Sequence, residues 1–190
     1  AIIITCAGRT FIAGADIKEF GKPPLDPSLP SVLAALSATS KILIAAIHGT
    51  ALGGGFEVAL SCHYRCALPT AKVGLPEVNL GILPGAGGTQ RLPRLIGVEP
   101  ALDMIVTGKP IGAVKAESLG IIDHLIQGDD LTEGAVSYAR SLIANGAKPR
   151  RIGDVNIDKA SIPEGFFADY RAKIAKTKRG FFSPPKIIDA

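Results

Sequence analysis

Three consecutive glycines, residues 53–55, run directly into an apolar stretch with the composition of a buried helix. The run removes side chains from the N-terminus of that helix, so bare backbone N–H groups and the positive end of the helix dipole are accessible together. Such a helix end can stabilise a developing negative charge. The pattern predicts a helix over 54–62 with an anion-stabilising site at its start.

Two glutamates flank this predicted site in sequence. Glu57 falls in the first turn of the helix, and Glu77 follows Pro76 twenty residues later, just before the glycine-rich loop 81–90. Two carboxylates that converge beside such a backbone can act as general acid and base on a carbonyl compound. Each also has a structural alternative, because glutamate often complements a helix dipole or occupies a surface turn.

Apolar, β-branched runs alternate with helical stretches along most of the chain, which predicts an α/β architecture with helices packed on sheet. A strand as apolar as a sheet interior is expected at the start, and the segment 22–30, with four prolines, is expected to be an irregular loop over the site. Strands are expected at 2–5, 42–47, 64–67, 72–74 and 121–126. Helices are expected at 32–38, 54–62, 101–106, 114–119, 131–144 and 166–178.

Composition indicates a globular chain with one substantial core, since 47% of its 190 residues are hydrophobic and 20% are charged. No apolar stretch is long and uninterrupted enough for a membrane helix. The net charge of +4 resides after Asn145, where ten Lys or Arg face five Asp or Glu. We therefore expect a catalytic core over 1–145 and a basic helical tail over 146–190, whose charge is either a solvated helix face or a contact for an anionic group.

Cysteine and histidine placement favours packing over metal chemistry. The cysteines at 6, 62 and 66 have no C-x-x-C spacing and are expected to be reduced core thiols of an intracellular protein. A metal site around Cys62, His63 and Cys66 lacks a fourth ligand, so no metal is expected. The histidines are expected in packing or turn positions: His48, His63 and His124.

A further small-residue turn, Ala13-Gly14-Ala15-Asp16, follows the first predicted strand and would let a ligand approach the backbone closely. The Ala15 N–H could then act opposite the Gly54 N–H as a second donor to an oxyanion. Together with the segments 48–57, 75–77 and 83–92, this turn resembles the enoyl-CoA hydratase/isomerase (crotonase) superfamily in order and spacing. The likeness covers roughly two thirds of the chain.

The resemblance implies a spiral of repeated β-β-α units, incomplete at both ends in this chain, and the hydration of 2-trans-enoyl-CoA to 3-hydroxyacyl-CoA in fatty-acid β-oxidation. It also implies enoyl-CoA isomerase activity as an option. Glu57 and Glu77 would be catalytic, and Ala15 and Gly54 would form the oxyanion hole. Residues that would bind the CoA substrate are Ala13, Asp16, Ile17, Lys18 and Gly85.

The segments 170–180 and 183–190 resemble the hydratase part of bifunctional enzymes, in which a 3-hydroxyacyl-CoA dehydrogenase follows. The resemblance implies that this chain is part of a larger protein, with no cofactor in this segment and NAD only in such a downstream domain. Its partners would be an acyl-CoA and either further copies, in a trimer-based oligomer, or the dehydrogenase domain. Neither nucleic acid nor membrane is expected, and the location would be the bacterial cytoplasm, or in a eukaryote the peroxisome or mitochondrion.

A different class of function stays open at this point. A non-catalytic scaffold or an RNA-binding protein of the same fold would be compatible with the basic, phenylalanine-containing tail, although no RNP-type motif accompanies it. A serine hydrolase is disfavoured because the sequence has no G-x-S-x-G. The pair Glu57 and Glu77 favours a hydratase over the scaffold or RNA-binding alternative.

Overall fold

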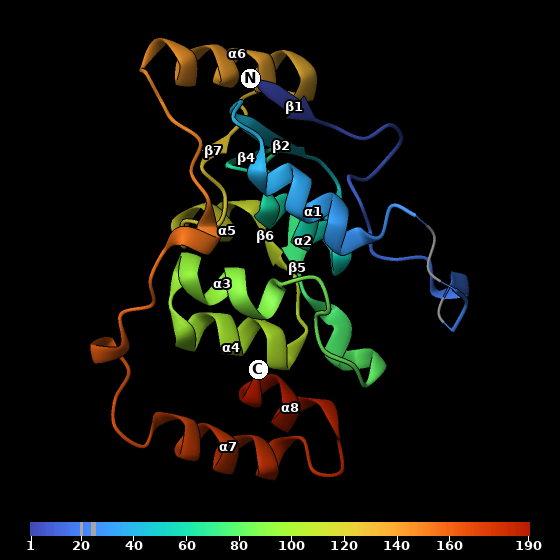
Figure 1. The fold of residues 1–190 in the computed structure, drawn as a ribbon, viewed down its shortest axis with the longest axis vertical. Helices are drawn as coiled ribbons and strands as arrows, with labels where there is room; N and C mark the ends of the chain where they lie inside the picture. Colours follow the sequence, from blue (N-terminus) through green and yellow to red (C-terminus); the bar gives the residue numbers. More distant parts are fainter. Residues whose placement is uncertain (20, 24–25) are drawn as a thin grey trace.

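The computed structural model describes residues 1–19, 21–23 and 26–190, and it has an α/β architecture with helices packed on two sheets (Figure 1). A four-stranded parallel sheet has the order β1-β2-β4-β7, and a three-stranded sheet has the order β3-β5-β6. The strands are β1 Ile2–Ile4, β2 Leu43–Ile47, β3 Thr50–Leu52, β4 Tyr64–Ala67, β5 Lys72–Gly74, β6 Ile111–Gly112 and β7 His124–Leu125.

The helices surround these sheets on several sides. Helix α6 covers β1, β2 and β4 at one end of the molecule, and the pair α3–α4 lies between the sheets and the pair α7–α8 at the other end (Figure 1). The α-helices are α1 Leu29–Ala38, α2 Gly54–Ser61, α3 Gly88–Ile96, α4 Val98–Thr107, α5 Ala113–Ser118, α6 Leu131–Ala144, α7 Phe166–Thr177 and α8 Ser183–Asp189. The 3-10 turns are η1 Ile17–Glu19, η2 Pro76–Leu80, η3 Ile152–Asp154 and η4 Lys159–Ser161.

The predicted β-β-α repeat is confirmed by the way the strands divide between the sheets. In the units β2-β3-α2 and β4-β5-η2-α3, the first strand joins the four-stranded sheet and the second joins the three-stranded sheet. Each unit therefore turns away from the large sheet before its helix begins. This arrangement sets the starts of α2 and η2 next to the small sheet, where the site lies.

Strand β2 is buried along its whole length because both faces of its sheet are covered. Leu43, Ala45 and Ile47 pack into the main core with α2 and α4, whereas Ile44 and Ala46 pack into a second cluster beneath α6. Alternate residues of a strand point to opposite faces, so a strand covered on both sides must be apolar at every position. The run of apolar residues that predicted this strand is continuous because both faces of the sheet are covered.

Several local predictions differ from the structure at the chain's N-terminal side. Strand β1 is half-exposed rather than buried, with Ile2 42% exposed, because among the described residues it is an edge strand that pairs with β2 alone. Helix α1 begins at Leu29, three residues earlier than predicted, because Ser28 caps it and Pro30 fits its first turn. The predicted irregular segment 22–30 therefore ends in a helix, and its residues 24–25 lie outside the described part.

Other differences concern two helices with glycine or proline in the first turn and one strand. Residues 81–90 were expected to form a loop, yet helix α3 already starts at Gly88. The helix also contains Pro93. Helix α8 starts with Ser183-Pro184-Pro185. Its first turn tolerates the two prolines because an N–H group at these positions would have no intrahelical acceptor. The predicted strand 121–126 is reduced to β7, since only two residues pair with β4.

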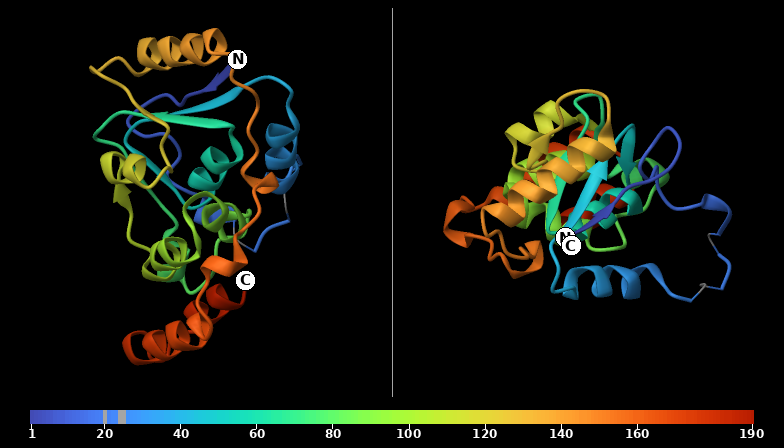
Figure 2. Two further views of the ribbon diagram at one scale, coloured as in Figure 1. Left: turned by 90° about the vertical axis from the view of Figure 1, so that its left-hand side faces the viewer. Right: turned by 90° about the horizontal axis from the view of Figure 1, so that it is seen from above.

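The predicted tail is in contact with the core. After α6 the chain runs in extended form along the molecule to α7 (Figure 2). Five apolar residues of the tail are buried in the same cluster as α2 and α4: Ile152, Tyr170, Ile174, Ile187 and Ile188. The division into a core over 1–145 and a tail over 146–190 stays a prediction, and other apolar side chains of the tail are exposed, Phe181 by 55% and Phe182 by 75%.

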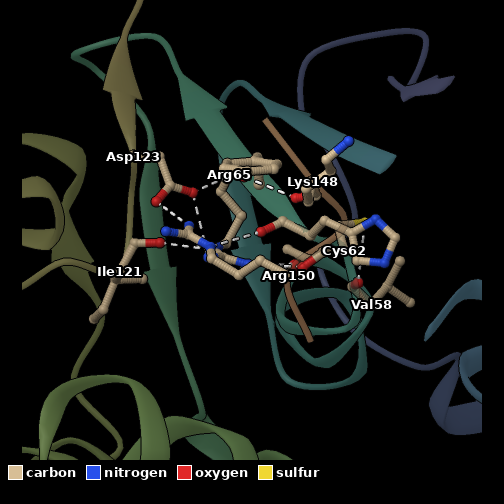
Figure 3. Close-up of polar contacts among 10 residues, drawn as sticks. Val58, Cys62, Arg65, Ile121, Asp123, Lys148 and Arg150 are labelled. Atoms are coloured by element: carbon tan, nitrogen blue, oxygen red, sulfur yellow. Dashed lines mark hydrogen bonds and ion pairs between the residues drawn. The ribbon is translucent and has the colours of Figure 1, made fainter. Parts of the chain in front are cut away.

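A buried guanidinium ties this extended segment to the large sheet (Figure 3). Arg65 on β4 is fully buried, and its Nε donates to the carbonyl oxygen of Ile121 at 2.6 Å. Its Nη2 lies 3.3 Å from Oδ2 of Asp123, and Arg150 from the extended segment pairs with the other oxygen of Asp123. Asp123 thus joins a strand of the sheet to the tail through two cations.

Two of the three cysteines and two of the three histidines occupy packing positions, whereas Cys6 is only partly buried. Cys62 and Cys66 are buried free thiols, and burial raises the pKa of each to about 12. The Nδ1 atom of buried His63 accepts the Leu43 N–H at 3.0 Å, and His124 stacks on a tyrosine ring. Among the described residues, no helix is both long and apolar enough to cross a bilayer.

Candidate active site

A cavity of about 340 Å³ lies where the start of α2, the turn η2, the loop after it and the segment before η1 meet. Its lining includes six of the nine predicted site residues: Ala13, Ala15, Gly54, Glu57, Glu77 and Gly85. A larger cavity of about 490 Å³ lies between α3–α4 and α7–α8 and includes neither glutamate. The structure therefore brings the two carboxylates and both predicted oxyanion donors to one site.

Gly53 makes the tight turn that begins α2. Its φ of 53° lies in the left-handed region that glycine adopts without strain, and its N–H donates to the Gly74 carbonyl of β5 at 3.0 Å. A Cβ at this position would stand 3.0 Å from Oε1 of Glu77. Gly53 therefore allows both the positive φ of the turn and the close approach of Glu77 in η2. Gly54, the first helical residue, keeps an N–H without an intrahelical acceptor at the cavity wall.

The segment before Ala15 packs directly on this helix start. Ile12 forms a bridge with Ala51, and its carbonyl accepts the Leu52 N–H at 3.0 Å. A Cβ at Gly55 would overlap both the carbonyl oxygen and the side chain of Ile12, so the helix and this segment can pack this closely only because residue 55 has no side chain. This contact sets Ala15 and Gly54 on the same cavity.

Alanine substitutions at Gly54 and Gly55 should therefore differ in their effect on stability. Gly54→Ala places Cβ 3.5 Å from Cδ2 of Leu29, an ordinary contact, and should change the free energy of unfolding by less than about 0.5 kcal/mol. Gly55→Ala forces Ile12 to move and should lower it by about 1–3 kcal/mol. Urea unfolding of the two variants measures the contrast, and equal stability would show that Ile12 does not rest on α2 as described.

Glu57 is held by backbone N–H groups from the loop before α3. Only 2% of Glu57 is exposed, and its Oε1 accepts the Ala86 N–H at 2.8 Å and the Gly88 N–H at 2.7 Å. Because Gly88 is the first residue of α3, the carboxylate also lies at the positive end of that helix. Both hydrogen bonds fix the orientation of the carboxyl group.

Glu77 is in a different environment. It lies in the first turn of η2 and is 9% exposed, and its Oε2 is buried without a hydrogen-bond partner among the described residues. Burial raises the pKa of Glu77 to about 7, and the nearby Glu57 carboxylate adds to that rise. A carboxyl group that titrates near neutrality beside a cavity is suited to proton exchange.

Of the remaining predicted residues, Asp16 and Lys18 are not among the described residues that line the cavity. Oδ1 of Asp16 accepts the Lys18 N–H at 2.9 Å, a local turn contact at an exposed position. Ile17 begins η1, and a role for its side chain lies outside the described part of the structure. A contact of these three residues with CoA stays a prediction. Within the described ranges, no group of three or more His, Cys, Asp or Glu is placed to hold a metal ion.

Sequence reasoning did not identify the apolar wall of the cavity. Leu80, Ile82 and Leu83 are 58%, 42% and 36% exposed, yet they line the cavity together with Leu29 of α1. The available signal was an apolar run inside an otherwise turn-rich loop. The two N–H donors to Glu57 were also missed, because nearly every residue has a backbone N–H and the sequence does not show which of them bind a side chain.

The fold and the cavity define a protein of the crotonase class. The family model described as enoyl-CoA hydratase/isomerase matches residues 1–154, and the chain belongs to that family. Among curated relatives, it is 42% identical over 190 residues to the peroxisomal bifunctional enzyme of Danio rerio, covering 100% of this chain and 26% of the relative. It is 43% identical over 152 residues to the glyoxysomal fatty acid beta-oxidation multifunctional protein MFP-a of Cucumis sativus, covering 75% of this chain and 21% of the relative.

Solved structures confirm the predicted fold. An enoyl-CoA hydratase from Bacillus anthracis has a TM-score of 0.69 at 40% identity, over 75% of this chain and 58% of that one. A protein from Geobacillus kaustophilus, described as enoyl-CoA hydratase subunit I, has a TM-score of 0.67 at 34% identity, over 99% of this chain and 68% of that one. The chain spans about a quarter of the length of the curated relatives it matches.

Proposed function

We propose that this chain catalyses the addition of water to a 2-trans-enoyl-CoA, giving a 3-hydroxyacyl-CoA in fatty-acid β-oxidation. The observation that carries the proposal is the pairing of two buried carboxyl groups, Glu57 and Glu77, in the cavity that Gly54 and Ala15 also line. Their environments differ, since two N–H donors hold one and burial raises the pKa of the other. A base and an acid at one site are what hydration of a conjugated double bond requires.

The proposed reaction begins with the thioester oxygen at the Ala15 and Gly54 N–H groups. Water bound between the carboxyl groups gives a proton to Glu57 as its oxygen bonds to C3, and the π electrons move to the thioester oxygen. The enolate then takes a proton from Glu77 at C2, and transfer of a proton from Glu57 to Glu77 restores the starting state. Removal of one oxyanion donor typically costs about 3–4 kcal/mol of barrier.

The apolar wall supports an acyl chain as the rest of the substrate. Side chains of Leu29, Leu80, Ile82 and Leu83 provide a hydrocarbon surface next to the carboxyl groups. Burial of a hydrocarbon chain there contributes roughly 25 cal/mol per Å² of apolar surface removed from water. CoA itself is proposed to contact the exposed turn at Asp16 and Lys18.

The pH dependence of hydration follows from Glu77. With a pKa of about 7 it holds the proton needed at C2 below neutrality and loses it above. We expect kcat/KM for crotonyl-CoA to fall as pH rises through about 7, because kcat/KM reports groups of the free enzyme. A steady-state series from pH 5.5 to about 9 measures this limb. A profile flat across neutrality would contradict the role of Glu77 as the acid.

The direct test of the proposed function is a hydration assay. Purified protein should consume crotonyl-CoA, seen as loss of the enoyl-thioester absorbance, and form 3-hydroxybutyryl-CoA in equal amount. A 3-enoyl-CoA tests the isomerase option, since the same two carboxyl groups could move a proton between C2 and C4. Absence of turnover with both substrates, in a protein that unfolds cooperatively, would reject the proposal.

We also propose a cellular location and a partner domain for this chain. The names of the curated relatives support a peroxisomal or glyoxysomal location and give no support to the bacterial cytoplasm. The likeness to bifunctional enzymes supports a longer protein in which a 3-hydroxyacyl-CoA dehydrogenase domain uses NAD to oxidise the hydration product. We propose that domain as the partner, in place of or together with further copies of the chain.

A further inference from the structure

Arg91 fastens the loop that holds Glu57, although it does not line the cavity. It lies in the first turns of α3, and its Nη1 donates to the Ala86 carbonyl oxygen at 2.8 Å. Its own backbone N–H donates to the Gly87 carbonyl oxygen at 2.8 Å. One residue therefore holds two consecutive carbonyl groups of the loop.

These carbonyl groups share rigid peptide planes with the loop's N–H groups. The Gly87 carbonyl and the Gly88 N–H belong to one peptide, which Arg91 holds at its oxygen and Glu57 at its nitrogen. The preceding peptide carries the Ala86 carbonyl and lies between the two N–H groups that bind Glu57. Loss of the Arg91 guanidinium frees this middle peptide, so the two donors lose their fixed spacing.

Packing and charge support the same arrangement. Gly87 has a φ of 96°, and a Cβ there would overlap the Arg91 guanidinium, which rests on the loop in the space that a side chain would take. Partial burial lowers the pKa of Arg91, and the negative charge of Glu57 acts against that change. The guanidinium therefore rests on the loop, and its charge interacts with that of Glu57.

We infer that Arg91 is a positioning residue, which fixes the peptide between the Ala86 and Gly88 N–H groups and through them orients the Glu57 carboxylate. Its effect on catalysis rests on the proposed function, whereas its effect on the loop does not. Misplacement of a catalytic group by about 1 Å can cost about a hundredfold in rate. Loss of Arg91 should therefore reduce turnover without weakening the binding of substrate.

Arg91→Met tests the inference against Arg94→Met, a control one turn later on α3, whose guanidinium donates to the Gln90 carbonyl instead. We expect Arg91→Met to lower kcat for crotonyl-CoA by about tenfold to a hundredfold with KM within about twofold. Arg91→Lys, which keeps the charge and one donor, should be intermediate. Amide exchange followed by NMR should be about tenfold faster at Ala86 and Gly88 in Arg91→Met, and unchanged in Arg94→Met.

The possible outcomes distinguish the positioning role of Arg91 from the proposed function. Wild-type exchange rates and a kcat within twofold of Arg94→Met would overturn the inference. If Arg91→Met fails to fold, Arg91→Lys replaces it: slower turnover with faster exchange supports the positioning role, and wild-type values for both refute it. If the parent protein does not hydrate crotonyl-CoA, the proposed function fails, and the exchange contrast still decides whether Arg91 fixes the loop.

Discussion

Glu77→Gln should lower kcat for hydration by about 10²- to 10⁴-fold, the range contributed by one acid–base group, while it makes the protein more stable above pH 7. The gain in stability comes from the raised pKa. The folded state keeps the Glu77 proton up to about pH 7, whereas the unfolded state loses it near 4.5. The stabilising contribution of the protonated group is therefore full below about 4.5 and is lost as pH rises to about 7. Glutamine does not titrate, so it avoids that loss.

Melting temperature at pH 8 separates loss of catalysis from loss of fold. The Glu77→Gln variant should melt above the parent, and Glu99→Gln, an exposed glutamate in the first turn of α4, should change neither activity nor melting temperature. Glu57→Gln should lose activity to a similar extent as Glu77→Gln. If the two glutamates act as a unit, as proposed, the double variant should be little worse than either single variant. A multiplicative loss would contradict the coupled mechanism.

Asp123→Ala should lower the free energy of unfolding by about 3–5 kcal/mol, because it removes the anion beside a fully buried cation. Arg65 would keep its carbonyl partners but lose the only carboxylate with which it pairs among the described residues. Arg150 would lose its ion pair as well, so the extended segment before α7 would lose a point of attachment to the sheet.

Urea unfolding measures this effect, with Asp154→Ala as the matched control. Asp154 forms an exposed pair with Arg151 at 4.0 Å, and such pairs contribute about 0–1 kcal/mol. A loss below about 1 kcal/mol in Asp123→Ala would show that the carbonyl groups alone satisfy Arg65. Arg150→Ala should fall between the two, because its side chain is 43% exposed.

The elements that sequence reasoning placed best are those whose ends are fixed locally. Helix α6 runs over the predicted residues because Asp130 caps its N-terminus through the Glu133 N–H. Helix α3 was missed because its N-terminus has no local cap of that kind. Its Gly88 N–H binds Glu57, 31 residues earlier, and no window of sequence contains both partners. The ion pair between Arg65 and Asp123 joins residues 58 apart and was missed for the same reason.

The candidate site was predictable to the extent that its residues are marked by unusual composition. The glycine run and the two glutamates led to the cavity, and the structure places Gly54, Glu57 and Glu77 in it together. The turn at Asp16 and Lys18 has the exposed charges expected of a ligand contact, but exposed charges are common on any surface. The apolar wall is formed by side chains whose exposure depends on the tertiary arrangement of η2 and α1, which composition does not report.

The anchoring of Glu57 has a stereochemical consequence. Both backbone donors bind Oε1, so Oε2 is the oxygen left to exchange a proton with water. A carboxylate that works through one oxygen, in one orientation, holds its water on one side of the substrate plane. In the proposed reaction, with the thioester held at the start of α2, the new C3–O bond would form on a single face of the double bond, and the product would carry one configuration at C3. The handedness of the product would then depend on two peptide N–H groups that do not touch the substrate.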